Sequence, residues 1–340
     1  MAGCIFFLLK FFVIMLNVAV VGVGLAGISA AVQCQKQGLN VALFDKSRGV
    51  GGRLATRRGF ETRFDHGLPS WQIQGDRTQQ LTEELIAENL LKPWQIARTN
   101  FNNIKDLQAL ETKISLMAPD GMTAIAKYLA RDLTLNRSYH LEKISQKSNH
   151  WELAFKNGEV VITEALILAI PCPQALPLVK DFITTEIGDR LKAISYEAAL
   201  SLMLGFEALE LNFPWQELRL DNHPIFKKII LDGQKRSPRT PTLVVQTNAT
   251  FTKQYLDTND LEPAAQILIT KLQALFNLSQ PSWHQIHRWR YALTKATLGD
   301  NHLALPTTLP LILCGDWCLG NGIEGAIASG TTAAKHFLEN

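Results

Sequence analysis

The sequence predicts an α/β fold with two domains, of which one has the parallel sheet of nucleotide-binding proteins. Between Asn17 and Asp45, a β-branched apolar run, a glycine-rich turn, a small-residue helix and a second apolar run follow one another. The C-terminal stretch supplies an apolar strand, a Gly-Asp pair and a closing helix. The region from Cys172 to Trp283 lacks such signals and consists of short segments punctuated by prolines, which predicts a second domain of antiparallel sheet and helices.

The glycine-rich turn has the spacing of a dinucleotide-binding site. It reads Gly22-Val23-Gly24-Leu25-Ala26-Gly27. Gly22 allows a tight turn, Gly24 lets the backbone approach a pyrophosphate, and Gly27 lets the helix lie close to the strand. The free N–H groups where the helix begins attract phosphates. The alternative is an ordinary glycine-rich connection between a strand and a helix.

Asp45 ends the second strand and narrows the choice of nucleotide. It lies eighteen residues beyond Gly27, where an acid can accept hydrogen bonds from the adenosine ribose hydroxyls. An acid at this position repels a 2′-phosphate. The pattern therefore favours FAD or NAD over NADP.

The residues after Asp45 distinguish FAD from NAD. They read Lys46-Ser47-Arg48-Gly49-Val50-Gly51-Gly52-Arg53. An acid followed closely by Gly-Gly-Arg resembles the flavoprotein family that includes amine oxidases, phytoene desaturases and renalases. The resemblance implies that Gly51 and Gly52 approach the FAD pyrophosphate, with Lys46, Arg48 and Arg53 nearby. A flexible loop is the alternative, but basic residues on both sides of the glycines favour an anion site.

The C-terminal stretch carries a second, independent resemblance to the same family. It implies that Gly315 and Asp316 meet the ribityl chain of FAD, and that the helix opening at Glu324-Gly325-Ala326 points its N-terminus at the flavin. Residues 320–325 also match GxGxxG, but only fifteen residues follow, too few for another βαβ unit. One nucleotide-binding domain is expected.

The run His284 to Ala292, which contains H-R-W-x-Y-A, makes the resemblance closest to the bacterial renalase-type branch. That branch implies a Rossmann-like FAD-binding domain of the glutathione-reductase type and non-covalent FAD. It also implies oxidation of dihydronicotinamide isomers by molecular oxygen. Asp65, His66 and Gly67 would lie near the isoalloxazine, although His66 can equally be a structural histidine.

Two departures from the branch concern the substrate pocket. Where the family continues with Ala-Gln-Tyr, this chain reads Leu68-Pro69-Ser70-Trp71 after Gly67, and Gln246 stands where a histidine is usual. The substrate can therefore differ. The predicted pocket residues are His66, Trp71, Gln246, Trp289 and Tyr291, while no catalytic residue is assigned. Each tryptophan can instead belong to the core.

The motifs divide the chain into a discontinuous FAD-binding domain and a substrate domain. The first comprises residues 15–68, 116–172 and 285–340, and the second comprises residues 69–115 and 173–284. Helical periodicity predicts helices at 78–91, 124–133 and 262–276. Apolar runs predict strands at 138–145, 151–155, 160–170, 198–206 and 242–247.

Composition excludes several classes of protein. A net charge of +3 without a basic stripe argues against a nucleic-acid partner. Five cysteines in mostly apolar surroundings indicate reduced thiols in a cytoplasmic protein, and the eight histidines show no metal spacing. The apolar stretch 5–16 is too short to cross a bilayer of roughly 30 Å. We expect Met15 to be the true start and residues 1–14 an extension, with a membrane anchor as the alternative.

These features predict an FAD-dependent oxidoreductase that abstracts a hydride from a nitrogen-containing small molecule. Such chemistry needs binding and orientation of the substrate but no nucleophile or metal. A classical flavin amine oxidase, a carotenoid-type desaturase or isomerase, and a non-catalytic flavin-binding redox module are the alternatives. A plain NAD-dependent dehydrogenase explains neither Gly51-Gly52-Arg53 nor the C-terminal motif.

Overall fold

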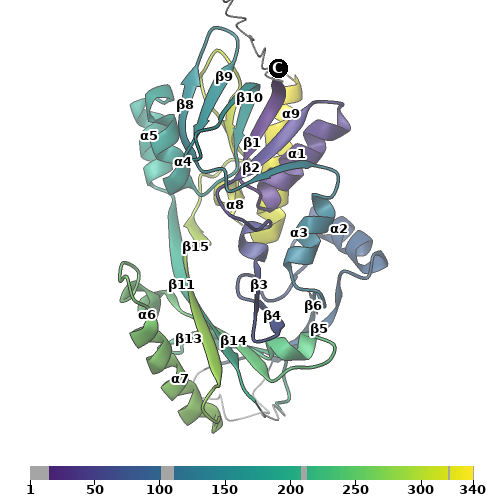
Figure 1. Ribbon diagram of the computed structural model, residues 1–340, viewed down its shortest axis with the longest axis vertical. Helices are drawn as coiled ribbons and strands as arrows, with labels where there is room; N and C mark the ends of the chain where they lie inside the picture. The colour runs from purple at the N-terminus through teal and green to yellow at the C-terminus, as the bar shows by residue number, and fades with distance from the viewer. Residues whose placement is uncertain (1–14, 101–110, 208–212, 321, 340) are drawn as a thin grey trace, which may run out of the picture.

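The computed structural model describes residues 15–100, 111–207, 213–320 and 322–339. The predictions for residues 1–14 fall outside this part of the chain. Figure 1 shows two large sheets, one above the other, connected by two long strands. Among the described residues, no helix combines the length and apolar character that crossing a membrane requires.

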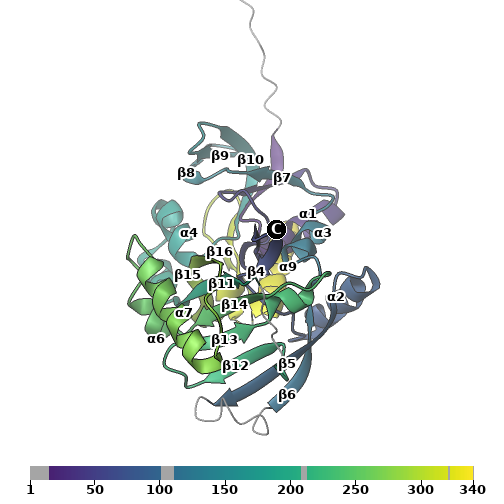
Figure 2. The ribbon, with the colours of Figure 1, turned by 60° about the horizontal axis from the view of Figure 1, so that its bottom comes forward.

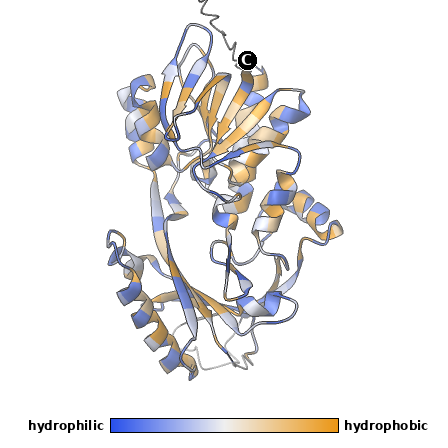
Figure 3. Cartoon of the chain, in the orientation of Figure 1, coloured by the Kyte–Doolittle hydropathy of each residue, from blue (hydrophilic) through white to orange (hydrophobic). Residues whose placement is uncertain are grey.

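The upper sheet has eight strands and a parallel centre. Its main path runs in the order β16 (Leu303–Ala304), β17 (Leu311–Leu313), β10 (Val160–Leu168), β1 (Leu16–Val21), β2 (Val41–Asp45) and β7 (Thr134–Arg137). The strands β8 (Leu141–Gln146) and β9 (Trp151–Phe155) extend β10 as an antiparallel meander. The centre of this sheet, which comprises residues 18–21 of β1, 41–44 of β2 and 165–168 of β10, is apolar, as Figure 3 shows, because both faces of the sheet are covered there.

Helices cover both faces of the upper sheet. On one face α1 (Leu25–Lys36) and α9 (Gly322–Glu339) pack together, with α3 (Thr123–Leu129) beside them. On the other lie α4 (Cys172–Val179) and α5 (Thr185–Lys192). A Cβ at Gly330 of α9 would come within 2.0 Å of the Ala26 carbonyl oxygen of α1. Glycine at this position therefore sets how closely these two helices approach.

The lower sheet has seven strands. Their order is β15 (Trp283–Ala296), β11 (Ser195–Gly205), β14 (Thr242–Thr247), β13 (Phe226–Ile230), β12 (Glu217–Asp221), β5 (Lys92–Asn100) and β6 (Glu111–Met117). All neighbours are antiparallel except β12 and β5. Figure 2 shows β5 and β6 at one end of this sheet. The helices α6 (Ala249–Lys253) and α7 (Glu262–Phe276) cover one of its faces.

The two faces of the lower sheet have different partners. Leu202, Ile229 and Val245 belong to the apolar cluster that includes residues of α6 and α7. Met203 and Val244, from alternate positions, pack instead with Phe64 of the hairpin formed by β3 (Thr56–Gly59) and β4 (Thr62–Asp65). We call this second face, which meets the nucleotide-binding part, the inner face.

Short elements complete the described chain. They are η1 (Gly52–Leu54), α2 (Asp76–Ala87), η4 (Lys180–Phe182), η5 (Asp232–Lys235) and α8 (Asp316–Leu319). The helix predicted at 78–91 ends at Ala87, because Asn89 takes a left-handed conformation with φ of 56°.

The predicted α/β fold class is confirmed. Strands at 151–155 and 242–247 and the helix at 262–276 have the predicted bounds. The strands β5, β6, β12 and β13 were not predicted from the sequence. The predicted domain boundary at residue 285 falls inside β15, which pairs with β11 of the lower sheet from Trp283 onward. The division into two domains stays a proposal.

Candidate active site

In the turn after β1, two of the three glycines leave no space for a side chain, whereas the third leaves open space. Gly22 has φ of 108°, and a Cβ at Gly27 would lie 1.9 Å from the Gly22 carbonyl oxygen. A Cβ at Gly24 would meet nothing within 4 Å. No side chain caps the N-terminus of α1, which begins at Leu25 and Ala26. The turn therefore leaves open space and helix N–H groups at one point, which suits a pyrophosphate.

Asp45 and the second glycine pair border the same turn. The Asp45 carboxylate accepts hydrogen bonds from the Val23 N–H (2.8 Å) and the Ser47 N–H (2.7 Å). Gly51 and Gly52 have positive φ, and a Cβ at Gly52 would lie 3.4 Å from the Gly24 Cα. The two glycine segments thus face each other at the end of β2.

The three basic residues of this loop, Lys46, Arg48 and Arg53, lie in different surroundings. Lys46 donates to the Gln174 side chain over 3.0 Å. Arg48 borders an open depression lined by residues 135–139. Arg53 forms a two-pronged ion pair with Asp316, which also accepts from the Thr294 hydroxyl.

Asp316 is buried, and its pairing with Arg53 joins the start of η1 to the start of α8. Burial opposes the charge on Arg53, but Asp316 holds the pKa of its guanidinium above the ordinary value. The neighbouring Gly315 N–H donates to Ser329 of α9 over 2.9 Å. The resemblance assigned Arg53 and Asp316 to different parts of FAD. The structure brings them into contact with each other.

Glu324 lies in the first turn of α9, but its side chain contacts the start of helix α2. Its carboxylate accepts from the backbone N–H groups of Thr78 (2.8 Å) and Arg77 (3.3 Å), and so caps the N-terminus of α2. Gly325 and Ala326 are buried beside it. A contact between this turn and FAD stays a prediction.

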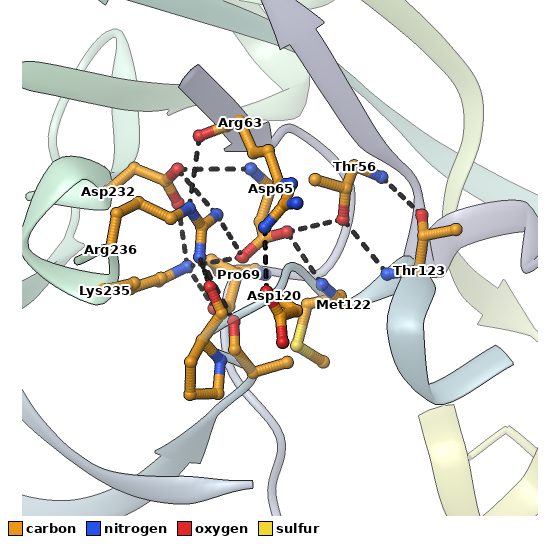
Figure 4. Close-up of polar contacts among 12 residues, drawn as sticks. Thr56, Arg63, Asp65, Pro69, Asp120, Met122, Thr123, Asp232, Lys235 and Arg236 are labelled. Carbon is orange, nitrogen blue, oxygen red and sulfur yellow. Dashed lines mark hydrogen bonds and ion pairs between the residues drawn. The ribbon is translucent and has the colours of Figure 1, made fainter. Parts of the chain in front are cut away.

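Asp65 belongs to a buried network of four charged groups, shown in Figure 4. One carboxylate oxygen accepts from the Thr56 hydroxyl (2.7 Å) and the Met122 N–H (2.9 Å). The other lies 3.2 Å from the Lys235 amine and 3.0 Å from the Arg236 guanidinium, which also pair with Asp232.

All four charged groups of this network are buried. Burial opposes ionisation, but Lys235 and Arg236 hold the pKa of Asp65 below its ordinary value. The Asp65 carboxylate thus holds the β3–β4 hairpin against η5. Its partners lie in the run D-G-Q-K-R (residues 232–236), which matches no known motif and therefore gave no signal in the sequence.

Next to Asp65, three rings gather where the hairpin meets β15. We call them the His66 cluster: the ring centroids of His66 lie 5.0 Å from His287 and 5.3 Å from Trp289, which are 4.6 Å apart. The Trp289 indole donates to the His66 carbonyl over 2.9 Å. The buried Nδ1 of His66 has no hydrogen-bond partner within the described chain.

The histidines of this cluster are neutral at pH 7. Burial, with contributions from His287 and Arg57, lowers the pKa of His66 to about 4. Burial and the nearby Arg57 also lower the pKa of His287. Two uncharged imidazoles can exchange hydrogen bonds with a ligand without adding positive charge to the site.

Gln246 joins this cluster to the lower sheet. Its amide donates to the Gly67 carbonyl, and on the inner face it is paired through Ser201 with His287 across β14, β11 and β15. Three of the predicted pocket residues, His66, Gln246 and Trp289, thus lie together beside Gly67, which was predicted to lie near the isoalloxazine.

Two other predicted pocket residues lie elsewhere. The ring of Tyr291 contacts Tyr196 at 5.1 Å, further along β15. Trp71 is fully buried in the core of the nucleotide-binding part and donates to the Thr82 hydroxyl over 2.8 Å. The core alternative therefore applies to Trp71. The core covers its apolar ring, and Thr82 accepts the hydrogen bond from its single N–H donor.

Sequence reasoning missed His287, which lies on the same face of β15 as Trp289. The signal that could have found it is alternation, because the two residues stand two positions apart in this strand.

Comparison with known proteins identifies the family. Residues 97–338 match the model of flavin containing amine oxidoreductases, and residues 20–85 match that of an NAD(P)-binding Rossmann-like domain. The chain belongs to the flavin containing amine oxidoreductase family. It is therefore a flavin-dependent oxidoreductase, and its cofactor is FAD.

Individual relatives of this flavoenzyme are distant. An acetone monooxygenase (methyl acetate-forming) of Gordonia sp. (strain TY-5) is 26% identical over 172 residues, which make up 49% of this chain. The match spans only 28% of that relative's length. Among solved structures, a protein assigned as a protoporphyrinogen oxidase of Exiguobacterium sp. 255-15 superposes with a TM-score of 0.72 at 15% identity, covering 95% of this chain and 99% of the other.

Putrescine oxidase bound to putrescine gives a TM-score of 0.70 at 14% identity, covering 96% of this chain and 99% of the other. At such low identity, both solved structures establish the shared fold only. The open Gly24 position, the facing Gly52 and the uncapped start of α1 fit the pyrophosphate of the FAD that the family uses.

Proposed function

We propose that this flavoenzyme abstracts a hydride from a carbon next to nitrogen in a small molecule, with molecular oxygen as the final electron acceptor. A dihydronicotinamide isomer, as in the renalase-type branch, is the proposed substrate. The observation that carries the proposal is the His66 cluster, which lies beside the contact of Gly67 with Gln246 of the lower sheet.

The chemistry divides between the cofactor and the chain. FAD supplies the two-electron acceptor when it is bound. The chain's own residues bind and orient the substrate: the Trp289 ring offers a flat apolar surface, and the unpartnered His66 Nδ1 can accept or donate one hydrogen bond. Because both imidazoles are neutral at pH 7, they add no positive charge where the substrate would bind.

A classical flavin amine oxidase is the second candidate. The family to which the chain belongs supports it directly. Such an enzyme would act on primary or secondary amines, which are cations at neutral pH.

The free thiols support a reducing, cytoplasmic location, which we propose together with the function. Cys34, Cys172, Cys314 and Cys318 are buried and unpaired by disulfides. Burial raises the pKa of the Cys34 thiol to about 11 and that of Cys172 to about 12. Such thiols are protonated and unreactive at neutral pH.

An anaerobic titration of the yellow, FAD-loaded protein tests the proposal. We expect the visible flavin absorbance to bleach with dihydronicotinamide isomers and to return when oxygen is admitted. Bleaching by simple amines but not by dihydronicotinamides would replace the proposal with the amine oxidase. A flavin that neither class reduces would contradict both candidates.

A further inference from the structure

The inner face of the lower sheet carries a row of polar side chains that the His66 cluster does not explain. Directly paired residues of antiparallel strands share a face, so His287, Ser201, Gln246, Lys228 and Arg219 form one row across β15, β11, β14, β13 and β12. Gln246 fixes the side of the sheet, because its amide contacts Gly67. Met203 and Val244, two positions away on their strands, pack on Phe64 of the hairpin.

Two of the five residues in the row are cations. Arg219 is held in place: its Nε donates to Glu217 over 2.8 Å, and its terminal nitrogen lies 3.4 Å from the Ser70 hydroxyl. Ser70 belongs to the segment after Gly67 in which this chain departs from the renalase-type pattern. The departing segment is therefore in contact with the cationic end of the row.

Lys228 is the cation without a direct partner. In the described part of the chain its amine has no hydrogen bond and no carboxylate within ion-pair distance. Its neighbour Lys227, by contrast, pairs with Glu197 at 3.3 Å. Burial lowers the pKa of Lys228 to about 8, with Glu217 opposing the shift. Lys228 therefore remains charged in most molecules at pH 7 and would be stabilised by an added anion.

The local charge is positive. Glu217 is fully buried and already engaged by Arg219, so one carboxylate faces two cations. Burial opposes ionisation of Glu217, but Lys228 and Arg219 hold its pKa below the ordinary value. Arg57 adds a further positive charge near His66 and His287. A cationic amine would be repelled at this face, whereas an oxyanion would be attracted.

We propose that Lys228, steadied by the Arg219–Glu217 pair, forms an anion subsite that binds a carboxylate or phosphate group of the substrate. This inference rests on the proposed function and narrows it: the nitrogen-containing substrate carries an oxyanion, and a simple di-cation such as putrescine is a poor ligand. Gln246 and Ser201 lie between this subsite and the His66 cluster in the row. We expect one substrate to contact both by extending across these two strands.

Three ligands with the same aromatic ring and different charge test the subsite. Benzoate, benzamide and benzylamine are titrated into the FAD-loaded full chain at pH 7, and binding is followed by the perturbation of the flavin spectrum. We expect benzoate to bind at least about tenfold more tightly than benzamide, because a charge-assisted hydrogen bond is worth that much. Benzylamine should be the weakest. Equal binding of benzoate and benzamide would overturn the proposal.

Variants assign the effect to Lys228. Lys228→Met should weaken benzoate about tenfold and leave benzamide within twofold, while Lys228→Arg should keep benzoate binding. Lys227→Met is the matched control and should bind benzoate like the unaltered chain. If Lys227→Met weakens benzoate as much as Lys228→Met does, or if neither does, the assignment to Lys228 is wrong.

The pH profile of the unaltered chain is a test that needs no altered protein. Benzoate affinity should fall as pH rises through about 8, where Lys228 loses its proton, and Lys228→Arg should remove this fall. A flat profile in the unaltered chain would contradict the proposal. Competition by inorganic phosphate then separates a site that accepts phosphate from one limited to planar carboxylates.

The outcomes separate this inference from the proposed function. If benzoate binding depends on Lys228 but no nitrogen compound reduces the flavin, the anion subsite is supported and the proposed reaction is wrong. Oxidation of a dihydronicotinamide riboside without selective benzoate binding does the reverse.

Discussion

Single residues separate cofactor binding from folding in the glycine turn. A side chain at Gly24 enters open space, whereas one at Gly27 strikes the Gly22 carbonyl oxygen. We expect Gly24→Val to leave the free energy of unfolding of the apoprotein within about 1 kcal/mol and to abolish FAD binding. Gly27→Ala should destabilise the fold itself by about 3 kcal/mol. Flavin absorbance per protein and urea unfolding measure the two effects. A yellow Gly24→Val protein would place the pyrophosphate elsewhere.

A second prediction at this scale concerns His66. Its pKa is about 4 in the folded protein and about 6.5 when unfolded, so the unfolded chain binds the extra proton first as pH falls. Stability is therefore complete above about pH 6.5 and decreases toward pH 4, by up to about 3 kcal/mol. His66→Gln should reduce that slope. Urea unfolding between pH 4 and 7 measures it, and an unchanged slope would show that other groups dominate.

At the scale of elements, helix α2 depends on a carboxylate from α9. Its N-cap residue, Gly75, has no side chain to offer, and Glu324 accepts from the first N–H groups instead. We expect Glu324→Ala to lower the free energy of unfolding by about 1–2 kcal/mol while the protein keeps its flavin. Glu324→Gln, which retains an acceptor, should recover part of the loss. Loss of flavin with unchanged apoprotein stability would instead support the cofactor role predicted from the sequence.

The elements also show what the sequence can and cannot predict. The buried parts of β1 and β10, residues 18–21 and 165–168, are apolar runs and were predicted as strands. The strands β12 and β13 were missed because Arg219 and Lys228 interrupt their apolar pattern. These interruptions lie on the inner face, where the candidate anion subsite lies. The failure of strand prediction and the candidate function therefore have one physical cause: charged side chains placed on a half-buried surface.

At the scale of the whole molecule, sequence motifs predicted the fold class and the cofactor, since each motif depends on neighbouring residues. The motifs could not predict which distant segments lie in contact. Asp65 and Lys235 are 170 residues apart, and nothing local in either segment indicates the other. The same holds for Gln246 and Gly67, which are 179 residues apart. Such contacts are determined by how the lower sheet packs on the hairpin.

The last prediction tests how these two parts are held together. The network of Asp65, Asp232, Lys235 and Arg236 balances two negative and two positive buried charges between the β3–β4 hairpin and η5. Asp65→Asn leaves a buried positive charge uncompensated, and we expect a loss of about 3–5 kcal/mol in the free energy of unfolding.

Lys235→Met in the Asp65→Asn background should restore charge balance and recover part of that loss, which gives a coupling energy above about 1 kcal/mol in a double-mutant cycle measured by urea unfolding. The exposed pair of Arg63 and Asp120, close by on the surface, is the control and should show coupling below about 1 kcal/mol. Additive losses at Asp65 and Lys235 would mean that each group is stabilised separately. The hairpin would then owe its position to the packing of Phe64 against Met203 and Val244 rather than to the charges.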